Sequence, residues 1–153
     1  MPRPDPKDPV LATNRKAFHD YTVLDRWEAG IHLCGTEVKS CRARAIQLQE
    51  GYVHIANGRA LLENVHIAPY DFGNRFNHKA TQTRELLMHR KEILKLSQTL
   101  KTKGGTIIPL KFYLKGGLVK VEIAYCQGKT HADKRETLKK RESDREISRA
   151  IKK

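Results

Sequence analysis

The sequence predicts a mainly β fold with helices, in which short antiparallel strands form a small barrel with packed helices and a basic C-terminal tail. Three observations support this prediction. Segments rich in β-branched and aromatic residues recur through the body of the chain. Asn57-Gly58 and Gly116-Gly117 are two-residue hairpin turns between such segments. Strands and helices do not alternate as they do in a parallel sheet, so an antiparallel arrangement is favoured.

Composition divides the 153 residues into three zones. Residues 1–13 hold four of the six prolines and have zero net charge, which predicts a flexible, extended leader. Residues 14–127 hold nearly all the aromatic and β-branched residues and form the expected β-barrel domain. Residues 128–153 contain ten Lys or Arg, five Asp or Glu and no continuous apolar stripe. We expect this tail to be disordered when free and helical against a phosphate-rich surface.

Strand-forming residues dominate the first half of the body. The expected strands are His19–Trp27, Ile31–Cys34, Tyr52–Ile55 and Ala60–Leu62, with Asn57-Gly58 joining the last two. A short helix is expected around Glu37–Ala45. A longer helix is expected from Arg84 to Lys101, where leucine and isoleucine recur at helical spacing. Thr83 is its expected N-cap, Glu85 suits the positive end of the helix dipole, and Gly104-Gly105 ends it.

The clearest hairpin runs from Leu110 to Tyr125 through Gly116-Gly117. Apolar and polar side chains alternate on both strands, so one face is apolar and the other polar. The polar face carries Lys111, Tyr113, Lys115 and Lys120. Ammonium groups can reach phosphates, and a ring can stack on a base. Strands of this number and length fit a barrel of the oligonucleotide-binding type, although periodicity leaves other small barrels open.

The net charge of +13 attracts phosphate polymers, but it does not separate DNA, RNA and anionic membranes. The three cysteines, Cys34, Cys41 and Cys126, show no CxxC spacing, which is typical of reduced thiols. No apolar run approaches the ~20 residues that span a bilayer, and the N-terminus has no secretory signal pattern. We therefore expect a cytoplasmic protein that does not bind a membrane.

The sequence contains no common catalytic motif. No serine lies in a GxSxG context, and HExxH, P-loop and GxGxxG patterns are absent. The seven histidines show no metal-ligand spacing. We expect no enzyme activity, no metal and no cofactor. Asp25 and Glu28 could act as an acid–base pair in a metal-dependent nuclease, but two carboxylates near a hairpin are more often surface charges.

Two further groups of residues are candidates for RNA contact. Lys39, Arg42 and Arg44 form a basic cluster. Asn77-His78 lies between two expected elements, where a recognition loop and a turn-forming role are equally consistent with the sequence.

Several strings in series resemble one protein family. They are Asn14-Arg15-Lys16-Ala17, His19-Asp20-Tyr21, Glu28-Ala29-Gly30-Ile31, Gly35 to Arg42, His66 to Tyr70, Asn77-His78, Leu86 to Ile93, Gly128-Lys129 and Asp133-Lys134-Arg135. In this order and spacing, from residue 14 to about 150, they resemble the SsrA-binding protein (small protein B) family of bacterial trans-translation. The resemblance implies an oligonucleotide-binding-like barrel with added helices.

The resemblance also implies partners. Members bind the tRNA-like domain of transfer-messenger RNA and deliver it to ribosomes stalled on mRNA without a stop codon. Their tail is thought to lie in the empty mRNA channel near the decoding centre, against small-subunit ribosomal RNA. Elongation factor Tu would be an indirect partner through the charged RNA, and the chain is expected to be a monomer.

Site residues follow from the strings and the basic clusters. The candidate RNA-binding residues of the body are Asn14, Arg15, Lys16, Glu28, Lys39, Arg42, Asn77, His78, Arg84, Leu87, His89 and Lys120. The candidate ribosome-binding residues of the tail are Lys129, His131, Asp133, Lys134, Arg135, Lys139, Lys140 and Arg141. By analogy, Glu28 accepts hydrogen bonds from base or ribose donors and Lys120 neutralises phosphate.

The chain departs from the family pattern at three places. Residues 80–85 lack the usual proline and extra basic residues before the long helix, so only Arg84 is carried over there. Ala132 stands where the family often has an aromatic residue or histidine, with His131 one residue earlier. Gln127 replaces a frequent lysine. A ribosomal or initiation-type barrel protein that binds ribosomal RNA alone remains the main alternative.

Overall fold

The computed structural model describes residues 9–70 and 77–129. The strands in these ranges are β1 (Val10–Thr13), β2 (Tyr21–Ile31), β3 (Ile46–Gln47), β4 (Tyr52–Ala56), β5 (Arg59–Glu63), β6 (His66–Ile67), β7 (Arg84–Leu87), β8 (Thr106–Lys115) and β9 (Leu118–Gly128). The helices are α1 (Arg15–Asp20), α2 (Gly35–Arg42) and α3 (Arg90–Lys103). In the described part of the chain, no helix is long and apolar enough to cross a membrane.

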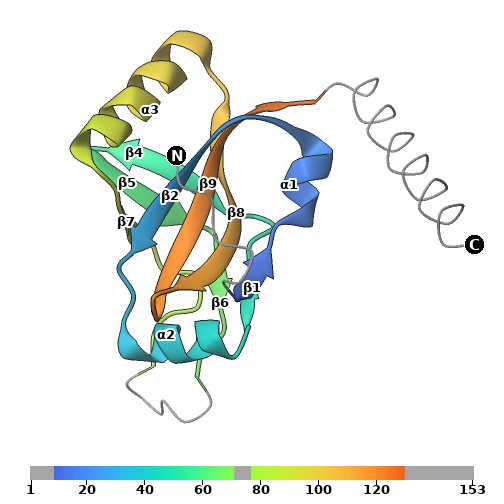
Figure 1. Cartoon of the computed structure of the whole chain (residues 1–153), viewed down its shortest axis with the longest axis vertical. Coiled ribbons are helices and arrows are strands. Elements are labelled where there is room, and N and C mark those ends of the chain that lie inside the picture. The colour runs from blue at the N-terminus through green and yellow to red at the C-terminus, as the bar shows by residue number, and fades with distance from the viewer. Residues whose placement is uncertain (1–8, 71–76, 130–153) are drawn as a thin grey trace, which may run out of the picture.

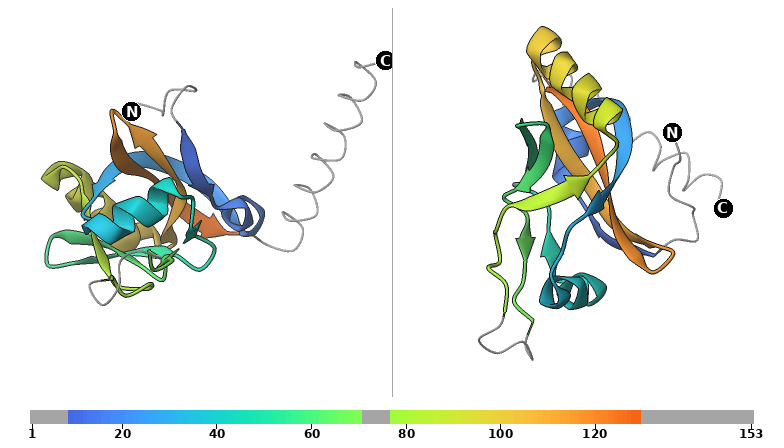
Figure 2. Two further views of the ribbon diagram at one scale, coloured as in Figure 1. Left: turned by 90° about the horizontal axis from the view of Figure 1, so that it is seen from below. Right: turned by 90° about the vertical axis from the view of Figure 1, so that its left-hand side faces the viewer.

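Six strands close into an antiparallel barrel in the order β8-β4-β5-β7-β2-β9, because β9 pairs with both β2 and β8. Strand β1 adds to β8 outside this ring, and β3 and β6 form a separate two-stranded sheet. Helices α3 and α2 lie at opposite ends of the barrel (Figures 1 and 2). The predicted fold class, a small antiparallel barrel with packed helices, is confirmed.

Apolar side chains from most of the barrel strands fill the interior. The largest fully buried ones include Phe112, Leu62, Leu86, Ile107 and Ile123, and Leu96 of α3 is buried with them. Burying each such side chain contributes about 1.5–3 kcal/mol relative to leaving it in water. The predicted alternation holds on β9, where Val119, Val121 and Ile123 line this core. On β8 it is interrupted: the register shifts between Pro109 and Lys111, and Leu110 packs in a second cluster with Ile108, Ala124 and Cys126.

Both predicted hairpin turns are present. Asn57 has a φ of 53° and Gly58 a φ of 72°, the pair of positive values that a type I′ turn requires. Gly116 and Gly117, with φ of 58° and 78°, make the same kind of turn between β8 and β9. The first turn places Asn57 and Gly58 beside the start of α3, and this position matters for the grooves described below.

The long helix begins at Arg90 and not at Arg84. Residues 84–87 are strand β7, in which Arg84 and Leu86 are buried and Leu87 is exposed. This alternation has the period of a strand, and β7 pairs with both β5 and β2. Closing the barrel therefore outweighs the helix propensity of the Arg84-Glu85-Leu86-Leu87 string.

Helix α3 has a different N-cap from the expected Thr83. His89 is the N-cap, and its backbone N–H donates to the Glu92 carboxylate at 3.2 Å. Gly104, with a φ of 68°, follows the last helical residue, so the predicted end of the helix is confirmed.

Smaller differences concern boundaries. The expected leader, 1–13, ends earlier, because Val10–Thr13 pair with β8 as strand β1. The first long strand begins at Tyr21, since residues 15–20 form α1. Residues 32–34 are outside any strand, although Ile31–Cys34 was expected to be one. The expected helix at 37–45 occurs as α2, and at the other end of the body β9 continues to Gly128, one residue beyond the expected boundary.

Candidate nucleic-acid interface

Four candidate residues from separate segments meet in one open groove of about 740 Å³. Glu28 comes from β2, Leu87 and His89 from β7 and the start of α3, and Lys120 from β9. Two further cations, Arg59 and Arg90, line the same groove and were not among the predicted site residues. They lie in the β4–β5 hairpin and the first turn of α3, so only the closed barrel brings them to this surface.

Strand register explains the shape of the groove. Gly30 of β2 lies between Leu87 on one side and Lys120 on the other, so the three residues form one row across neighbouring strands. A Cβ at position 30 would lie 3.2 Å from the Cβ of Leu87. The missing side chain therefore leaves a hollow between Leu87, which is 58% exposed, and Lys120. An apolar side chain and an ammonium group on either side of a hollow suit a ribose or base face with its phosphate.

Glu28 lies on the same face, two residues before Gly30, and its carboxylate has protein partners. The Tyr113 hydroxyl donates to Oε2, and Lys115 Nζ lies 3.3 Å and 3.4 Å from Oε2 and Oε1. Partial burial opposes ionisation of Glu28, but the Tyr113 and Lys115 hydrogen bonds and the charge of Lys120 outweigh it and lower the pKa of Glu28. The carboxylate is thus held ionised and oriented at the edge of the groove.

Tyr113 corrects one expectation. Its ring was expected on an exposed face, where it could stack on a base, but Tyr113 is fully buried. Strand β1 pairs along this part of β8, with Val10 opposite Tyr113. The hydroxyl contacts Glu28, and the ring cannot stack on RNA in this arrangement.

Replacing Tyr113 with Phe is expected to raise the pKa of Glu28, because the ionised carboxylate loses a hydrogen-bond donor. The pKa can be followed by NMR titration of the Glu28 side-chain carboxyl. Tyr125→Phe is the matched control, since the Tyr125 hydroxyl donates to the carbonyl of Gly104 at 2.6 Å and should leave Glu28 unaffected. An unchanged Glu28 pKa in Tyr113→Phe would refute this role of the hydroxyl.

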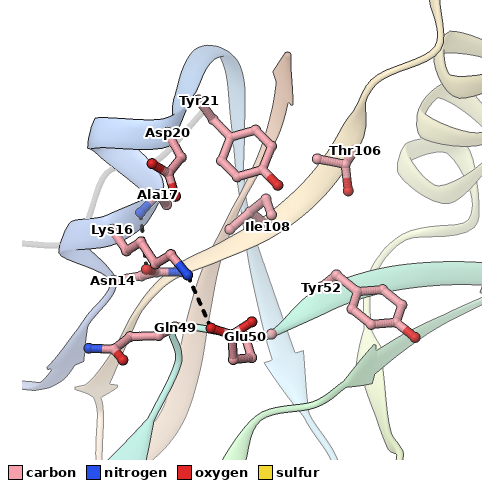
Figure 3. A pocket seen from close by; sticks show the side chains of 11 residues that line it. Asn14, Lys16, Ala17, Asp20, Tyr21, Gln49, Glu50, Tyr52, Thr106 and Ile108 are labelled. Atoms are coloured by element: carbon pink, nitrogen blue, oxygen red, sulfur yellow. Dashed lines mark hydrogen bonds and ion pairs between the residues drawn. The ribbon is translucent and has the colours of Figure 1, made fainter. Parts of the chain in front are cut away.

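Asn14, Arg15 and Lys16 lie around the start of α1. Asn14 is buried: its Oδ1 accepts from the Ala17 N–H at 3.1 Å, and its Nδ2 donates to the carbonyl of Pro109 at 3.0 Å. Arg15 is exposed. Lys16 pairs with Glu50 at 3.1 Å on the edge of a polar pocket of about 250 Å³ (Figure 3). Asn14 therefore caps the helix and attaches it to β8, while Arg15 and Lys16 are exposed at its first turn.

Asn77 and His78 take the turn-forming role. Asn77 Nδ2 donates to the carbonyl of Tyr70 at 2.6 Å, and its Oδ1 accepts from the Tyr70 N–H at 3.0 Å. His78 is buried, with Nε2 2.8 Å from the carbonyl of Ile67 and Nδ1 2.9 Å from the Thr36 hydroxyl. Since the carbonyl can only accept, Nε2 carries a proton. Both side chains join the ends of the segment between Tyr70 and Asn77 to the body.

Lys39 and Arg42 lie exposed on α2, at the end of the barrel opposite α3. The Lys39 ammonium lies 5.3 Å from the centroid of the Tyr70 ring, and Arg42 donates to the carbonyl of Gly117 at 3.3 Å. These two residues are therefore not brought together with Glu28 and Lys120. They form a separate basic surface.

Arg84 is the clearest correction among the candidate residues. It is 2% exposed, and its Nε donates to the carboxylate of Glu37, which is 1% exposed. Its other nitrogens donate to the carbonyls of Val65 at 2.8 Å and Ala80 at 2.9 Å. Burial opposes ionisation of Glu37, but the Arg84 hydrogen bond and charge, with bonds from Cys34, lower its pKa. Arg84 holds β7 in the barrel and does not lie on an RNA-facing surface.

The tail residues are represented here only by Lys129. Its Nζ donates to the carbonyl of Phe18 at 3.0 Å, and its backbone N–H donates to the carbonyl of Asp20 at 2.9 Å. The other candidate residues, His131, Asp133, Lys134, Arg135, Lys139, Lys140 and Arg141, lie outside the described residues.

Residues 9–70 and 77–129 contain no group of three or more His, Cys, Asp or Glu that could hold a metal ion. The three cysteines are free thiols. Cys34 is exposed, while burial raises the pKa of Cys41 to about 12 and that of Cys126 to about 11. The two buried thiols are therefore protonated at neutral pH.

A closed six-stranded antiparallel barrel with an open groove of charged side chains around an exposed leucine is the architecture of oligonucleotide-binding barrels. Comparison with known proteins identifies the family of this barrel. Residues 11–153 match the family model described as "SmpB protein", and the chain belongs to this family.

Relatives are similar over almost the whole chain. The SsrA-binding protein of Lactobacillus delbrueckii subsp. bulgaricus is 58% identical over 140 residues, which is 92% of each chain. That of Ligilactobacillus salivarius is 53% identical over 152 residues, covering 99% of this chain and 98% of the relative. A chain from the solved structure described as "tmRNA-SmpB: a journey to the center of the bacterial ribosome" is 40% identical, with a TM-score of 0.67 over 80% of this chain and 86% of that one.

Proposed function

We propose that this protein binds the tRNA-like domain of transfer-messenger RNA and delivers it to ribosomes stalled on mRNA that lacks a stop codon. It acts in the cytoplasm as a monomeric binding protein without catalysis. Its tail probes the empty mRNA channel beside small-subunit ribosomal RNA, and elongation factor Tu meets it only through the charged RNA. Membership of the SmpB family and the likeness to a chain from a tmRNA-SmpB structure support this proposal.

One observation of the site carries the proposal. Glu28, Leu87, His89 and Lys120, the positions that match the family's RNA-contacting residues, line a single groove although they come from three parts of the chain. The groove combines the fixed Glu28 carboxylate with an exposed apolar side chain and cations, which can read base edges, ribose and phosphate. Two further carboxylates, those of Glu85 and Glu92, also line it. Glu28 makes the surface selective, because a carboxylate repels phosphate and accepts only from donors on bases or ribose.

The test is binding of a purified tRNA-like domain, with a single-stranded RNA of equal length as competitor, at two salt concentrations. We expect selectivity for the tRNA-like domain to persist at the higher salt while absolute affinity falls steeply. Lys120→Ala should lower the slope of log affinity against log salt by about one. Lys103→Ala, which removes an exposed cation at the far end of α3, is the control and should leave selectivity unchanged.

Two results would overturn the proposal. If both RNAs lost affinity equally as salt rose, the barrel would be a non-specific polyanion binder. If ribosomal RNA fragments bound as tightly as the tRNA-like domain, the reading as a ribosomal barrel protein would replace this one.

A further inference from the structure

A second groove lies beside the first and is lined by residues of α3 and the β4–β5 hairpin. These two elements lie next to each other in Figure 1. Its volume is about 670 Å³. The two grooves share Asn57, Gly58, Arg90 and Ile93, so they meet over the β4–β5 turn. The two grooves therefore form one continuous depression on the surface of the described residues.

The floor of the second groove is apolar and contains an exposed leucine. Leu94 of α3 is 59% exposed, close to the 58% of Leu87 in the first groove, and Ile55 of β4 lies half-buried opposite it. The helical pattern explains why Leu94 is exposed. Ile93 and Leu96 point into the barrel, and Leu94 falls outside the stripe that these two define.

Cations surround this floor. Arg90, Lys91 and Lys101 line the groove and no carboxylate does. Among the described residues, none of these three makes an ion pair. The second groove thus shares with the first an exposed leucine beside lysine and arginine, but it lacks the three carboxylates of the first, Glu28, Glu85 and Glu92.

We propose that the second groove is a subsite for an unpaired nucleotide of the same RNA, with its base or ribose on Leu94 and its phosphate between Lys91 and Lys101. This inference rests on the proposed function of the first groove. Continuity of the two hollows indicates one ligand that crosses the β4–β5 turn. Free cations without a lining carboxylate favour a phosphate backbone as that ligand, and a flat base covers the exposed leucine. The absence of a carboxylate also predicts that this subsite accepts any base.

The experiment compares two changes, each with its own control, in the full-length protein bound to the tRNA-like domain. Leu94→Ala should weaken binding about 5-fold by removing the apolar floor. Lys91→Ala should lower the slope of log affinity against log salt by about one. Each has a matched control outside both grooves: Leu118→Ala replaces a leucine that is 63% exposed at the β8–β9 turn, and Lys95→Ala removes an exposed lysine from the same helix. All four changed positions are exposed or nearly so, and unfolding midpoints will show that every variant folds.

Lys120→Ala separates failure of this inference from failure of the proposed function. If Lys120→Ala weakens binding while Leu94→Ala and Lys91→Ala match their controls, the subsite is wrong and the first groove stands alone. If the wild type shows no selectivity for the tRNA-like domain, the proposed function itself fails. If Leu94→Ala leaves RNA affinity unchanged but lowers rescue of stalled ribosomes, the groove takes a protein segment, and the nucleotide subsite is again overturned.

Discussion

Removal of residues 130–153 is expected to abolish rescue of stalled ribosomes while the affinity for the tRNA-like domain stays within about 3-fold at moderate salt. The groove residues all precede Val121, and the barrel is complete at the end of β9. Cutting after Lys129 also keeps its bonds to the carbonyls of Phe18 and Asp20, which attach the end of β9 to α1. We therefore expect RNA binding to depend on the body of the chain and ribosome rescue to depend on the tail.

The measurement pairs RNA binding with peptide-tagging or ribosome-release activity in a translation system stalled on truncated mRNA. The removed segment carries nine Lys or Arg and five Asp or Glu, so the salt dependence of binding to any RNA should become shallower. Simultaneous Ala replacement of Asp133, Lys134 and Arg135 should reproduce the loss of rescue without the change in salt dependence expected from deletion. Rescue by the truncated protein, or loss of its RNA affinity, would show that the division between body and tail is mistaken.

Arg84→Ala is expected to lower the free energy of unfolding by about 3–5 kcal/mol at neutral pH. The substitution leaves the Glu37 carboxylate charged and buried, with Arg84 and its bonds to the Val65 and Ala80 carbonyls gone. Urea unfolding measures the loss. Lys79→Ala, an exposed cation near β7 in sequence, is the control and should change stability by less than about 0.5 kcal/mol.

The pH dependence distinguishes loss of the ion pair from loss of packing. In the wild type the pKa of Glu37 is below its ordinary value of 4.5, so this carboxylate adds stability above that pH, and the contribution is lost as pH falls through the lowered pKa. In Arg84→Ala, burial dominates and raises the pKa of Glu37. The variant should then become more stable as pH falls toward 4.5, whereas the contribution of Glu37 to the wild type stays constant over that range and is lost only at lower pH. A parallel pH dependence of the two proteins would contradict this account.

Replacing both partners should cost less than replacing one. In the double variant Glu37→Gln with Arg84→Met, no charge is left at this buried site, so it should be more stable than Arg84→Ala. If the double variant were less stable than both the wild type and Arg84→Ala, the loss of stability in Arg84→Ala would be due to lost packing and not to the buried charge.

The fold could be predicted from local patterns where those patterns were unambiguous. The hairpin of β8 and β9 alternates regularly and has a glycine turn, and the Asn57-Gly58 turn has one common conformation. The stretch from Arg84 to Leu87 could not be assigned locally, because its residues favour a helix and also alternate. Its strand form depends on Glu37, which lies 47 residues earlier in the chain. No local rule reveals a partner at that distance.

The candidate site was predicted in part, and mainly through the family resemblance. Four matched positions meet in one groove, but composition alone could not place Glu28 beside Lys120. Asn14, His78 and Arg84 were also selected, yet all three are buried and hold the barrel together. A conserved-looking string does not separate a residue that touches RNA from one that supports the fold. Arg59 and Arg90 were missed because each is an ordinary surface cation until the strands close.

Barrel closure has a consequence for how the protein is made. Arg26 of β2 pairs with Ala124 of β9. Strand β2, which is made early, therefore has no β9 to pair with until the end of the chain has been synthesised. At about 5–20 residues per second, this wait lasts roughly 5–20 s during synthesis, with an unpaired β edge exposed. A chain whose own synthesis stalls before Leu118 lacks β9, the strand that joins β2 to β8, and cannot close the ring. Production of this protein therefore depends on uninterrupted translation of its own mRNA.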